Sequence, residues 1–263
     1  MCKIISAVSG KGGVGKTTSV TNISAYIAMQ GKKVLVVDID PLHNLTTSFG
    51  LTQDEISVSI YDLMKNIIED EPDDVIAKMV EQSIVKTNTV SIIPAVRKLK
   101  NLETMIPSAT CPERIVEYLL SFVKDDYEYI FLDCCAGLNM FVKNTLAASD
   151  SVLIPVEAHI LSSDAIDPVE EMIHTVRRRI NRNLAIEGII ITKYQGNTNY
   201  CNSVYEWVTN EFGKDIHIFR DPVKYTIKVA EAPSYGLSLH EYAPKTDAAK
   251  AYVKIAKEVM LNA

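Results

Sequence analysis

Residues 10–17 have the types and spacing needed to bind the phosphates of a nucleotide. They read Gly-Lys-Gly-Gly-Val-Gly-Lys-Thr, in which Gly10, Gly15, Lys16 and Thr17 match the phosphate-loop pattern G-x-x-x-x-G-K-[ST]. Glycines let successive backbone N–H groups turn inward without Cβ clashes, and a helix N-terminus after the loop adds positive potential. In such a loop Lys16 reaches the β and γ phosphates, and the Thr17 hydroxyl is a ligand of Mg²⁺. The pattern therefore predicts a site for a nucleotide and magnesium.

The flanking residues favour this prediction over a glycine-rich turn that merely precedes an ordinary helix. An apolar run at residues 4–8 comes before the loop, and Val20, Ile23 and Ile27 recur on one face of a helical pattern after it. Strand, glycine loop and helix is the arrangement in which this pattern binds phosphate. The loop residues expected to contact the nucleotide are Gly10, Lys11, Gly12, Gly13, Val14, Gly15, Lys16, Thr17 and Thr18.

Three aspartates lie where two further apolar runs end. Asp38 and Asp40 follow the run at residues 34–37, and two carboxylates two residues apart leave a strand on the same face. Next to a phosphate loop they could orient Mg²⁺, its water ligands or an attacking water. Asp133 closes the run at residues 129–132, where an aspartate holds Mg²⁺ directly or through water. These positions extend the predicted site from the phosphates to the metal and the water.

Short apolar runs alternate with helical patterns along the chain. The runs are rich in Val and Ile and nearly continuous, as expected for parallel strands covered on both faces. This alternation predicts a doubly wound α/β fold, a mostly parallel sheet flanked by helices, with the site at the C-terminal ends of the strands. A length of 263 residues suits one large domain, residues 1–263, better than two small ones. The expected strands are residues 4–8, 34–37, 90–93, 129–132, 152–156 and 189–191, with 216–219 as a further candidate.

Three local signals mark expected helix ends. Gly31 is placed to close the helix that follows the glycine loop. Ser59 and Asp62 have the spacing of a capping box at a helix start. Asp167 and Pro168 resemble an N-cap and a first helical residue, with acidic residues in the turn that follows.

Composition limits the classes of protein to which the chain can belong. A formal charge of −6, from 27 basic and 33 acidic residues, argues against indiscriminate binding of DNA or anionic lipid over the whole surface, but not against a local basic patch. Five cysteines without C-x-x-C spacing indicate neither a disulfide framework nor a zinc site. The chain enters its first strand at once, leaving no room for a signal peptide, and no apolar run approaches the ~20 residues of a membrane span. We expect a soluble cytoplasmic protein with reduced thiols.

The glycine loop and the three aspartates closely resemble those of the ParA/MinD family of deviant Walker ATPases, in particular its ParA (Soj-like) branch. The resemblance covers nearly the whole chain. Its E-A-P-S-x-G segment is more specific to the ParA branch than the phosphate loop is. The matching pieces are K-G-G-V-G-K-T-T at residues 11–18, D-I-D-P-x-x-N at 38–44, the strand end at Asp133, V-L-I-P-V at 152–156, G-I-I-I-T at 188–192, E-A-P-S-x-G at 231–236 and E-Y-A-P-K at 241–245.

The resemblance implies a dimer in which two ATP-bound subunits pack face to face with the nucleotides between them. Lys11, the extra lysine of the loop, would cross the interface to the partner's phosphates. Lys16 and Thr17 would serve the phosphates and Mg²⁺ of their own subunit, and Asp40 would position or activate the attacking water. A lysine supplied by the partner links hydrolysis to dimerisation, so ATP acts as a switch.

The remaining matches imply contacts with the metal and the nucleotide, and a cellular role. Asp38 would support the magnesium environment, Asp133 would contact Mg²⁺ through water, and Asn44 lies at a position that contacts the nucleotide. Such proteins hydrolyse ATP slowly to ADP and phosphate, and a ParB-like partner stimulates them. The ATP dimer would bind nucleoid DNA without sequence preference and position a plasmid, a chromosome origin or a protein cargo.

DNA binding is the part of the resemblance that this chain matches least well. The arginine usual in one basic segment is Asn197 here, although a second segment keeps Lys224 and Lys228. The densest basic run, at residues 177–179 with Arg182, could equally be a solvated last turn favoured by the helix dipole. We expect weak, salt-sensitive, ATP-dependent DNA binding. The candidate residues are Arg177, Arg178, Arg179, Lys224 and Lys228.

Two further departures from the family pattern leave alternatives open. Relatives commonly read D-C-P-P-S-L-G after this strand, whereas this chain has Cys135 and Ala136 in place of the two prolines. The adjacent Cys134 and Cys135 could be buried inert thiols, a redox sensor or ligands of an iron–sulfur cluster. A related fold uses a cluster cysteine three residues after the aspartate, where this chain has Ala136. His43 is either an ordinary loop histidine or a residue that senses the γ-phosphate.

Two other functions within the same fold remain possible from the sequence. A MinD-like membrane regulator would end in a basic amphipathic helix, whereas residues 251–263 lack a basic cluster and have the pattern of a helix that packs on the domain. A metabolic or electron-transfer ATPase would show ligand cysteines or a dedicated substrate pocket, and the E-A-P-S-x-G segment favours the ParA reading instead. We therefore expect no membrane binding.

Overall fold

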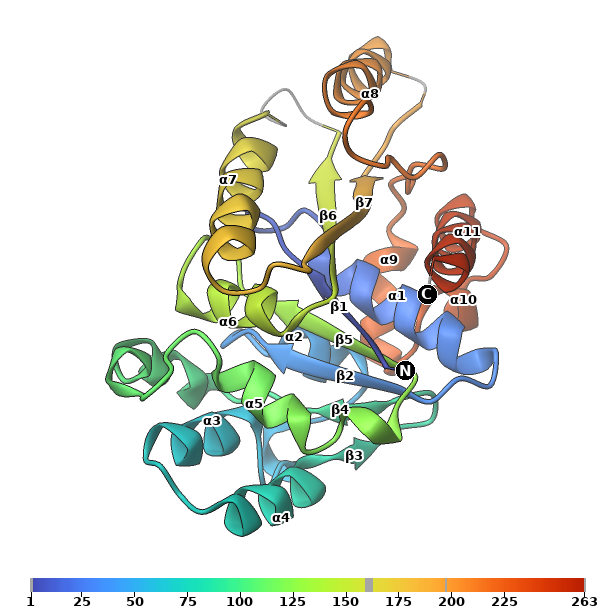
Figure 1. Ribbon diagram of the computed structural model, residues 1–263. Helices are drawn as coiled ribbons and strands as arrows, with labels where there is room; N and C mark the ends of the chain where they lie inside the picture. Colours follow the sequence, from blue (N-terminus) through green and yellow to red (C-terminus); the bar gives the residue numbers. More distant parts are fainter. Residues whose placement is uncertain (1, 159–162, 197, 263) are drawn as a thin grey trace.

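The architecture is a seven-stranded sheet with helices on both faces, as the sequence predicts (Figure 1). The computed structural model describes residues 2–158, 163–196 and 198–262. The strand order is β3-β4-β2-β5-β1-β6-β7, and neighbouring strands are parallel except for β3. The strands are β1 (Lys3–Ala7), β2 (Val34–Ile39), β3 (Val85–Lys86), β4 (Ser91–Ile93), β5 (Tyr129–Cys134), β6 (Ser151–Glu157) and β7 (Ala185–Thr192).

The helices form two layers, each with its own apolar core. Helices α1, α10 and α11 cover one face of the sheet, while α3, α4, α5, α6 and α7 cover the other (Figure 1). The helices are α1 (Lys16–Met29), α2 (Asn44–Ser48), α3 (Ile60–Ile68), α4 (Asp73–Ser83), α5 (Ile115–Ser121), α6 (Met140–Ala148), α7 (Ser163–Arg179), α8 (Asn199–Phe212), α9 (Lys228–Glu231), α10 (Leu239–Tyr242) and α11 (Asp247–Leu261).

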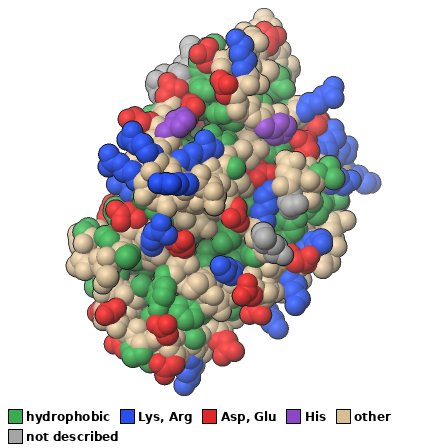
Figure 2. Space-filling view, in the orientation of Figure 1, with side chains coloured by type: hydrophobic (Ala, Val, Ile, Leu, Met, Phe, Trp, Pro, Cys, Tyr) green, Lys and Arg blue, Asp and Glu red, His purple; other side chains and the backbone are tan. Residues whose placement is uncertain are grey.

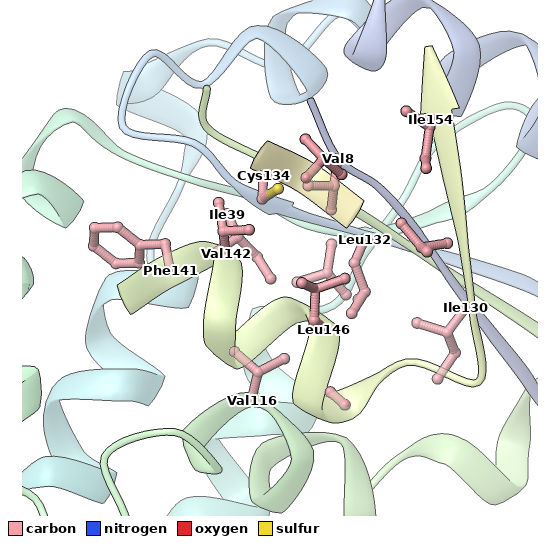
Figure 3. Close-up of a cluster of buried hydrophobic side chains, with 14 of the residues drawn as sticks. Val8, Ile39, Val116, Ile130, Leu132, Cys134, Phe141, Val142, Leu146 and Ile154 are labelled. Atoms are coloured by element: carbon pink, nitrogen blue, oxygen red, sulfur yellow. The ribbon is translucent and has the colours of Figure 1, made fainter. Parts of the chain in front are cut away.

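Strand β5 shows how the apolar runs fill both layers at once. Successive side chains of a strand point to opposite faces of the sheet. Ile130 and Leu132 therefore pack under α6, where Val142 and Leu146 meet them (Figure 3). Phe131 belongs to the other core, beside α1 and α11. Burial on both faces explains why the run reads as continuously apolar rather than alternating.

The surface is mixed in charge, in keeping with the formal net charge of −6. On the face seen in Figure 2, acidic and basic side chains are interspersed, except where Lys and Arg gather over the lower half of α7. In the part of the chain that the structure describes, no helix is long and apolar enough to cross a bilayer. Helix α11 packs against α1 through Tyr252, Ile255 and Val259, which are buried, as expected for a helix that belongs to the core.

Two of the three predicted helix ends are confirmed. Gly31 follows the C-cap of α1 with φ of 84°, a left-handed conformation that suits glycine. Ser59 caps α3, and its hydroxyl and backbone N–H both donate to the Asp62 carboxylate, at 2.6 and 2.9 Å. The capping box is therefore present as expected.

The predicted start of α7 is wrong. Asp167 and Pro168 are not its N-cap and first residue, because α7 begins at Ser163 and Pro168 lies inside it. Ile166 and Val169 are both buried, and the same stripe continues through the helix. Packing of this stripe on the sheet outweighs the loss of one helical hydrogen bond at the proline.

Two differences at the sheet margins have simple causes. Strand β3 was not predicted, because a two-residue antiparallel strand carries no periodicity. Residues 216–219 form one isolated bridge, between Ile189 and Ile218, rather than a strand. Phe219 still donates to Ile189, and Val223 donates to Ile191, so the segment lies along β7 without full strand pairing.

Candidate nucleotide-binding site

The glycine loop between β1 and α1 has the backbone that a phosphate site requires. Gly13 and Gly15 have φ of 76° and 92°, a region that residues with a Cβ rarely adopt. Gly15 is the N-cap of α1 without a side-chain cap bond, and the first turn of α1 carries no acidic residue. The N–H groups at this helix start are therefore available to an anion.

Lys16 and Thr17 begin α1 and have different partners. Lys16 is 7% exposed, and its ammonium donates to the Lys11 carbonyl oxygen at 3.5 Å, which holds the charge over the loop. The Thr17 hydroxyl donates to Asp133 Oδ2 at 2.7 Å and so joins α1 to the end of β5. A cation and a hydroxyl thus lie beside the loop in the places expected from the sequence.

Asp38 and Asp133 are neighbours on adjacent strands, and both are fully buried. Burial raises the pKa of the Asp133 carboxyl well above its usual range, and the nearby Asp38 charge raises it further. Asp133 Oδ1 is buried and has no hydrogen-bond partner among the described residues. An unpartnered buried carboxylate oxygen is costly unless a cation or donor completes it.

Asp38 is held by the loop that follows it. Its Oδ2 accepts from the Thr46 N–H at 2.8 Å and from the Thr46 hydroxyl at 2.7 Å, and its Oδ1 accepts from the Asp40 N–H at 3.1 Å. Burial raises the pKa of Asp38 to about 7, although the hydrogen bonds from Thr46 and Asp40 oppose that rise. In this structure Asp38 anchors the start of α2, where it fixes the turn that carries Asp40.

The donor set around Thr17 fits magnesium bound together with a nucleotide. The described residues contain no group of three or more His, Cys, Asp or Glu side chains placed to hold a metal. Mg²⁺ in nucleotide sites typically takes one or two protein oxygens and completes its shell with phosphates and water. The Thr17 hydroxyl beside the unpartnered Asp133 Oδ1 supplies that kind of incomplete set.

A cavity of about 730 Å³ opens at the carboxyl ends of the strands. Asp40 lines it, and the Leu42 N–H donates to Asp40 Oδ1 at 2.9 Å, which fixes that carboxylate. His43 has φ of 48° but is not among the lining residues. The predicted site residues that line the cavity are Gly12, Gly13, Gly15, Lys16, Thr17, Thr18, Asp40 and Asn44. Those that do not line it are Gly10, Lys11, Val14, Asp38 and Asp133.

Another part of the lining comes from residues that sequence reasoning did not assign to the nucleotide. Tyr225 and Ile227 line the cavity and are 59% and 58% exposed, and Leu42 at the same cavity is 68% exposed. Lys193, also in the lining, has φ of 50°. The sequence did contain a signal for these residues, because the segment with Tyr225 and Ile227 leads directly into the E-A-P-S-x-G motif. Large exposed apolar side chains at one opening mark a surface suited to being covered.

Thr192, at the end of β7, supports the loop from outside the phosphate motif. Its hydroxyl, which is buried, lies 2.7 Å from the Val14 carbonyl oxygen and 3.2 Å from the Val156 carbonyl oxygen. A Cβ on Gly15 would meet the Thr192 methyl carbon at 3.4 Å. The last residue of G-I-I-I-T therefore ties the end of the sheet to the back of the glycine loop.

The E-A-P-S-x-G motif starts at Glu231, the last residue of α9, and continues through the 3-10 turn Ala232–Tyr235 to Gly236. Glu231 accepts from Lys228 at 2.7 Å and from the Tyr242 hydroxyl at 2.9 Å, and these bonds lower the pKa of its carboxyl. Gly236 has φ of 66°, and a Cβ there would lie 3.1 Å from the Gly50 Cα. This close backbone approach explains the glycine, and it packs the motif against the turn after α2.

The vicinal cysteines have the surroundings of structural thiols. Cys134 is buried and donates to the Ala7 carbonyl oxygen at 3.4 Å, and burial raises its pKa well above the usual range. Burial also raises the pKa of Cys135, whose sulfur accepts from Asn139 at 3.2 Å. Protonated thiols are poor nucleophiles and poor metal ligands, so this geometry favours the inert reading.

The predicted DNA-binding candidates divide into two groups. Near the cavity, Lys224 pairs with Asp247 at 2.8 Å, and Lys228 pairs with Glu231 at 2.7 Å. The three arginines of residues 177–179 form the last turn of α7 instead. Asn197, the position of the missing family arginine, lies outside the described residues.

Comparison with known proteins gives matches over the full length of the chain. A family model described as an AAA domain matches residues 2–186. The sporulation initiation inhibitor protein Soj of Bacillus subtilis (strain 168) is 34% identical, covering 100% of both chains. The chromosome-partitioning ATPase Soj of Treponema pallidum (strain Nichols) is 32% identical, covering 99% of this chain and 98% of its own.

The fold also recurs in solved structures. The ADP- and magnesium-bound cobyrinic acid a,c-diamide synthase of Mycobacterium smegmatis superposes with a TM-score of 0.83, covering 99% of this chain and 94% of its own. Its identity to this chain is 24%, so this likeness describes the fold alone. Because one fold can host many functions, the function of this chain must be argued from its site.

Proposed function

Because this chain belongs to the ParA/MinD family of P-loop ATPases, we propose that it is a ParA-type positioning ATPase whose Mg-ATP form dimerises face to face. The chain is an ATP hydrolase that uses ATP with Mg²⁺. Hydrolysis to ADP and phosphate ends the dimeric state. The dimer holds a cargo and the monomers release it, so the ATPase cycle controls the position of the cargo in the cell.

The observation that carries this proposal is the apolar rim of the nucleotide cavity. Leu42, Tyr225 and Ile227 line the cavity while keeping more than half of their surface exposed. A second copy placed over the opening would bury them and enclose the nucleotide. Lys11 lies on the same loop as the cavity-lining glycines, and the dimer would bring it to the partner's phosphates.

The residues of the site divide the chemistry among them. The start of α1 and Lys16 bind the phosphates, and Thr17 with Asp133 would hold Mg²⁺, which neutralises phosphate charge when bound. Asp40, fixed by the Leu42 N–H, accepts a hydrogen bond from the attacking water and orients it. Lys11 of the partner adds the last positive charge, so turnover requires the dimer.

The names of the relatives support a role in partitioning. Soj of Treponema pallidum is named a chromosome-partitioning ATPase. By analogy, a ParB-like partner stimulates hydrolysis here, and the ATP dimer acts in the cytoplasm on nucleoid DNA.

Replacing Asp40 tests the proposal directly. Asp40→Ala should reduce the maximal ATPase rate by at least tenfold and accumulate the ATP-bound dimer, because water is no longer oriented while phosphate contacts remain. Phosphate release and sedimentation with ATP measure the two effects, and Asp54→Ala, which removes an exposed carboxylate elsewhere, is the matched control. Turnover equal to wild type would remove Asp40 from the mechanism.

A further inference from the structure

Helix α2 is short, but its surroundings hold it firmly beside the nucleotide cavity. Leu45 and Phe49 are buried in the apolar core that also contains the buried face of α1. Just after the helix, Gly50 lies so close to Gly236 that a Cβ on Gly236 would meet the Gly50 Cα at 3.1 Å. The helix is therefore anchored at its core face and at its C-terminal end, and the polar side chains that it carries have fixed positions.

Thr46, in the middle of α2, is a fully buried polar residue that joins two strand ends. Its hydroxyl donates to Asp38 Oδ2 at 2.7 Å and accepts from the Ala95 N–H at 2.9 Å. Its own N–H donates to the same Asp38 oxygen at 2.8 Å. One hydroxyl thus connects β2 to the segment that follows β4. A valine, which has nearly the same shape, would make neither of the two hydroxyl bonds.

The chain of hydrogen bonds continues from Thr46 to Asp40. The Asp40 N–H donates to Asp38 Oδ1 at 3.1 Å, so the two oxygens of Asp38 hold Thr46 on one side and Asp40 on the other. The Asp40 carboxylate accepts from the Leu42 N–H at 2.9 Å, and its carbonyl oxygen accepts from the His43 N–H at 2.8 Å. The position of the Asp40 carboxylate is therefore tied, through Asp38, to the Thr46 hydroxyl.

Thr46 stands behind the site rather than in it. Asp40 lines the nucleotide cavity, whereas Thr46, Asp38 and Ala95 are not among the described residues that line it. Phosphate binding depends on the glycine loop and the start of α1, which follow a different strand. The orientation of a reacting water, by contrast, is sensitive to small displacements of the group that holds it. Loss of the hydroxyl should therefore affect the reaction and leave nucleotide binding in place.

We propose that Thr46 is a positioning residue for ATP hydrolysis, which acts through Asp38 to set the carboxylate of Asp40. The hydroxyl is the group required, because it donates to Asp38 and accepts from Ala95 at the same time. It fixes the turn after β2 to the segment after β4. This role rests on the proposed function, in which Asp40 orients the attacking water.

Steady-state ATPase assays of two Thr46 variants test this role in the full-length protein. Thr46→Val should lower kcat by about tenfold while KM for ATP stays within about twofold of wild type, because the water loses its orientation and the phosphate contacts remain. Thr46→Ser keeps the hydroxyl and should keep the wild-type kcat. Thr209→Val, the same change at an exposed threonine of α8, is the matched control and should leave both parameters unchanged. A wild-type kcat in Thr46→Val, or a raised KM with unchanged kcat, would overturn the proposal.

A double variant separates positioning through Asp40 from a general loss of structure. Adding Thr46→Val to Asp40→Ala should lower turnover no further, because the carboxylate that Thr46 positions is already absent. A defect in packing alone would lower the turnover of the double variant below that of Asp40→Ala. Such a further loss would contradict a role that runs through Asp40.

Amide hydrogen exchange supplies a measurement that needs neither nucleotide nor turnover. In the nucleotide-free wild type, the N–H groups of Asp40, Thr46 and Ala95 all donate within this network and should exchange slowly. Thr46→Val should speed exchange at Asp40 and Ala95 by about tenfold or more and leave the amides of α1 unchanged. Rapid exchange at Asp40 in wild type would overturn the proposal even if the valine variant did not fold, and so would unchanged exchange at Asp40 in a folded valine variant.

The two failures can be told apart. If Asp40→Ala hydrolyses ATP like wild type, the hydrolytic role of Asp40 and the positioning role of Thr46 both fail. If Asp40→Ala loses turnover while Thr46→Val keeps it, only the role of Thr46 fails. ATP-dependent dimerisation should survive in Thr46→Val, since Thr46 does not line the cavity.

Discussion

At the scale of single residues, the site is built around the buried carboxylates of Asp38 and Asp133. Without a bound cation, two adjacent negative charges in this buried region are unfavourable. Asp38 uses its hydrogen bonds to hold the turn that carries Asp40. One oxygen of Asp133, beside Thr17, has no hydrogen-bond partner among the described residues. The pKa of each carboxyl is raised, mainly by burial. Ionising both without a cation is unfavourable, which explains why a bound magnesium and nucleotide would complete this region.

The raised pKa of Asp38 predicts how stability depends on pH in the nucleotide-free protein. Its folded pKa of about 7 lies above the ordinary value near 4, so the native state holds the proton more tightly than the unfolded chain does. This contribution is fully present below pH 4 and is lost as pH rises through 7, with a slope of at most about 1.4 kcal/mol per pH unit.

Asp38→Asn should therefore flatten the decline in free energy of unfolding between pH 5 and pH 8. Urea unfolding without magnesium or nucleotide measures that slope, and Asp54→Asn at an exposed position should leave it unchanged. An Asp38→Asn slope equal to that of wild type would show that Asp38 does not titrate in this range. The absolute stability of this variant should also fall, since an amide has a single acceptor oxygen and cannot accept from both Thr46 and the Asp40 N–H.

At the scale of elements, the parts with long local patterns were predictable and the parts made by tertiary contact were not. The apolar runs identified six of the seven described strands because each of the six is buried on both faces. The phosphate loop was predictable because its chemistry lies in consecutive residues. Strand β3 and the start of α7 were missed because pairing and packing, rather than local signals, decide them.

The cavity lining shows the same limit on what could be predicted from the sequence. Asp40 and the loop glycines could be assigned from motifs, but Tyr225 and Ile227 enter the site only because their segment runs along β7. The role of Thr192 likewise depends on the neighbouring strand β6 and on Val14, far away in sequence. Such contacts leave no periodicity in a single sequence.

Removing the Thr192 hydroxyl tests this link between β7 and the loop. Thr192→Val keeps the shape but leaves the Val14 carbonyl without this donor, which should cost about 1–3 kcal/mol of stability and weaken ATP binding severalfold. Thr192→Ser keeps the hydroxyl and should bind ATP like wild type. Equal affinity of the valine and serine variants, measured by fluorescent nucleotide titration, would show that the hydroxyl does not organise the loop.

At the scale of the whole molecule, the two edges of the sheet carry different side chains. The carboxyl edge carries the nucleotide cavity with its exposed apolar rim. The amino edge carries the arginines in the last turn of α7, which precedes β7. The proposed face-to-face dimer would cover the first edge and leave the second open.

The proposed function depends on ATP bringing two subunits together through Lys11. Lys11→Ala removes the charge that would reach the partner's phosphates but leaves Lys16, Thr17 and the loop backbone of its own subunit in place. Nucleotide should therefore still bind while dimerisation fails. Lys257→Ala, at an exposed position on α11, is the matched control and should dimerise.

Sedimentation equilibrium measures ATP-dependent dimerisation through Lys11 most directly. The experiment uses saturating Mg-ATP and the Asp40→Ala background, which prevents turnover. The chain should sediment at its monomer mass of 29.2 kDa with ADP and at twice that mass with ATP, and adding Lys11→Ala should return it to the monomer mass with nucleotide still bound. A monomer at saturating ATP, or a full dimer despite Lys11→Ala, would contradict the account.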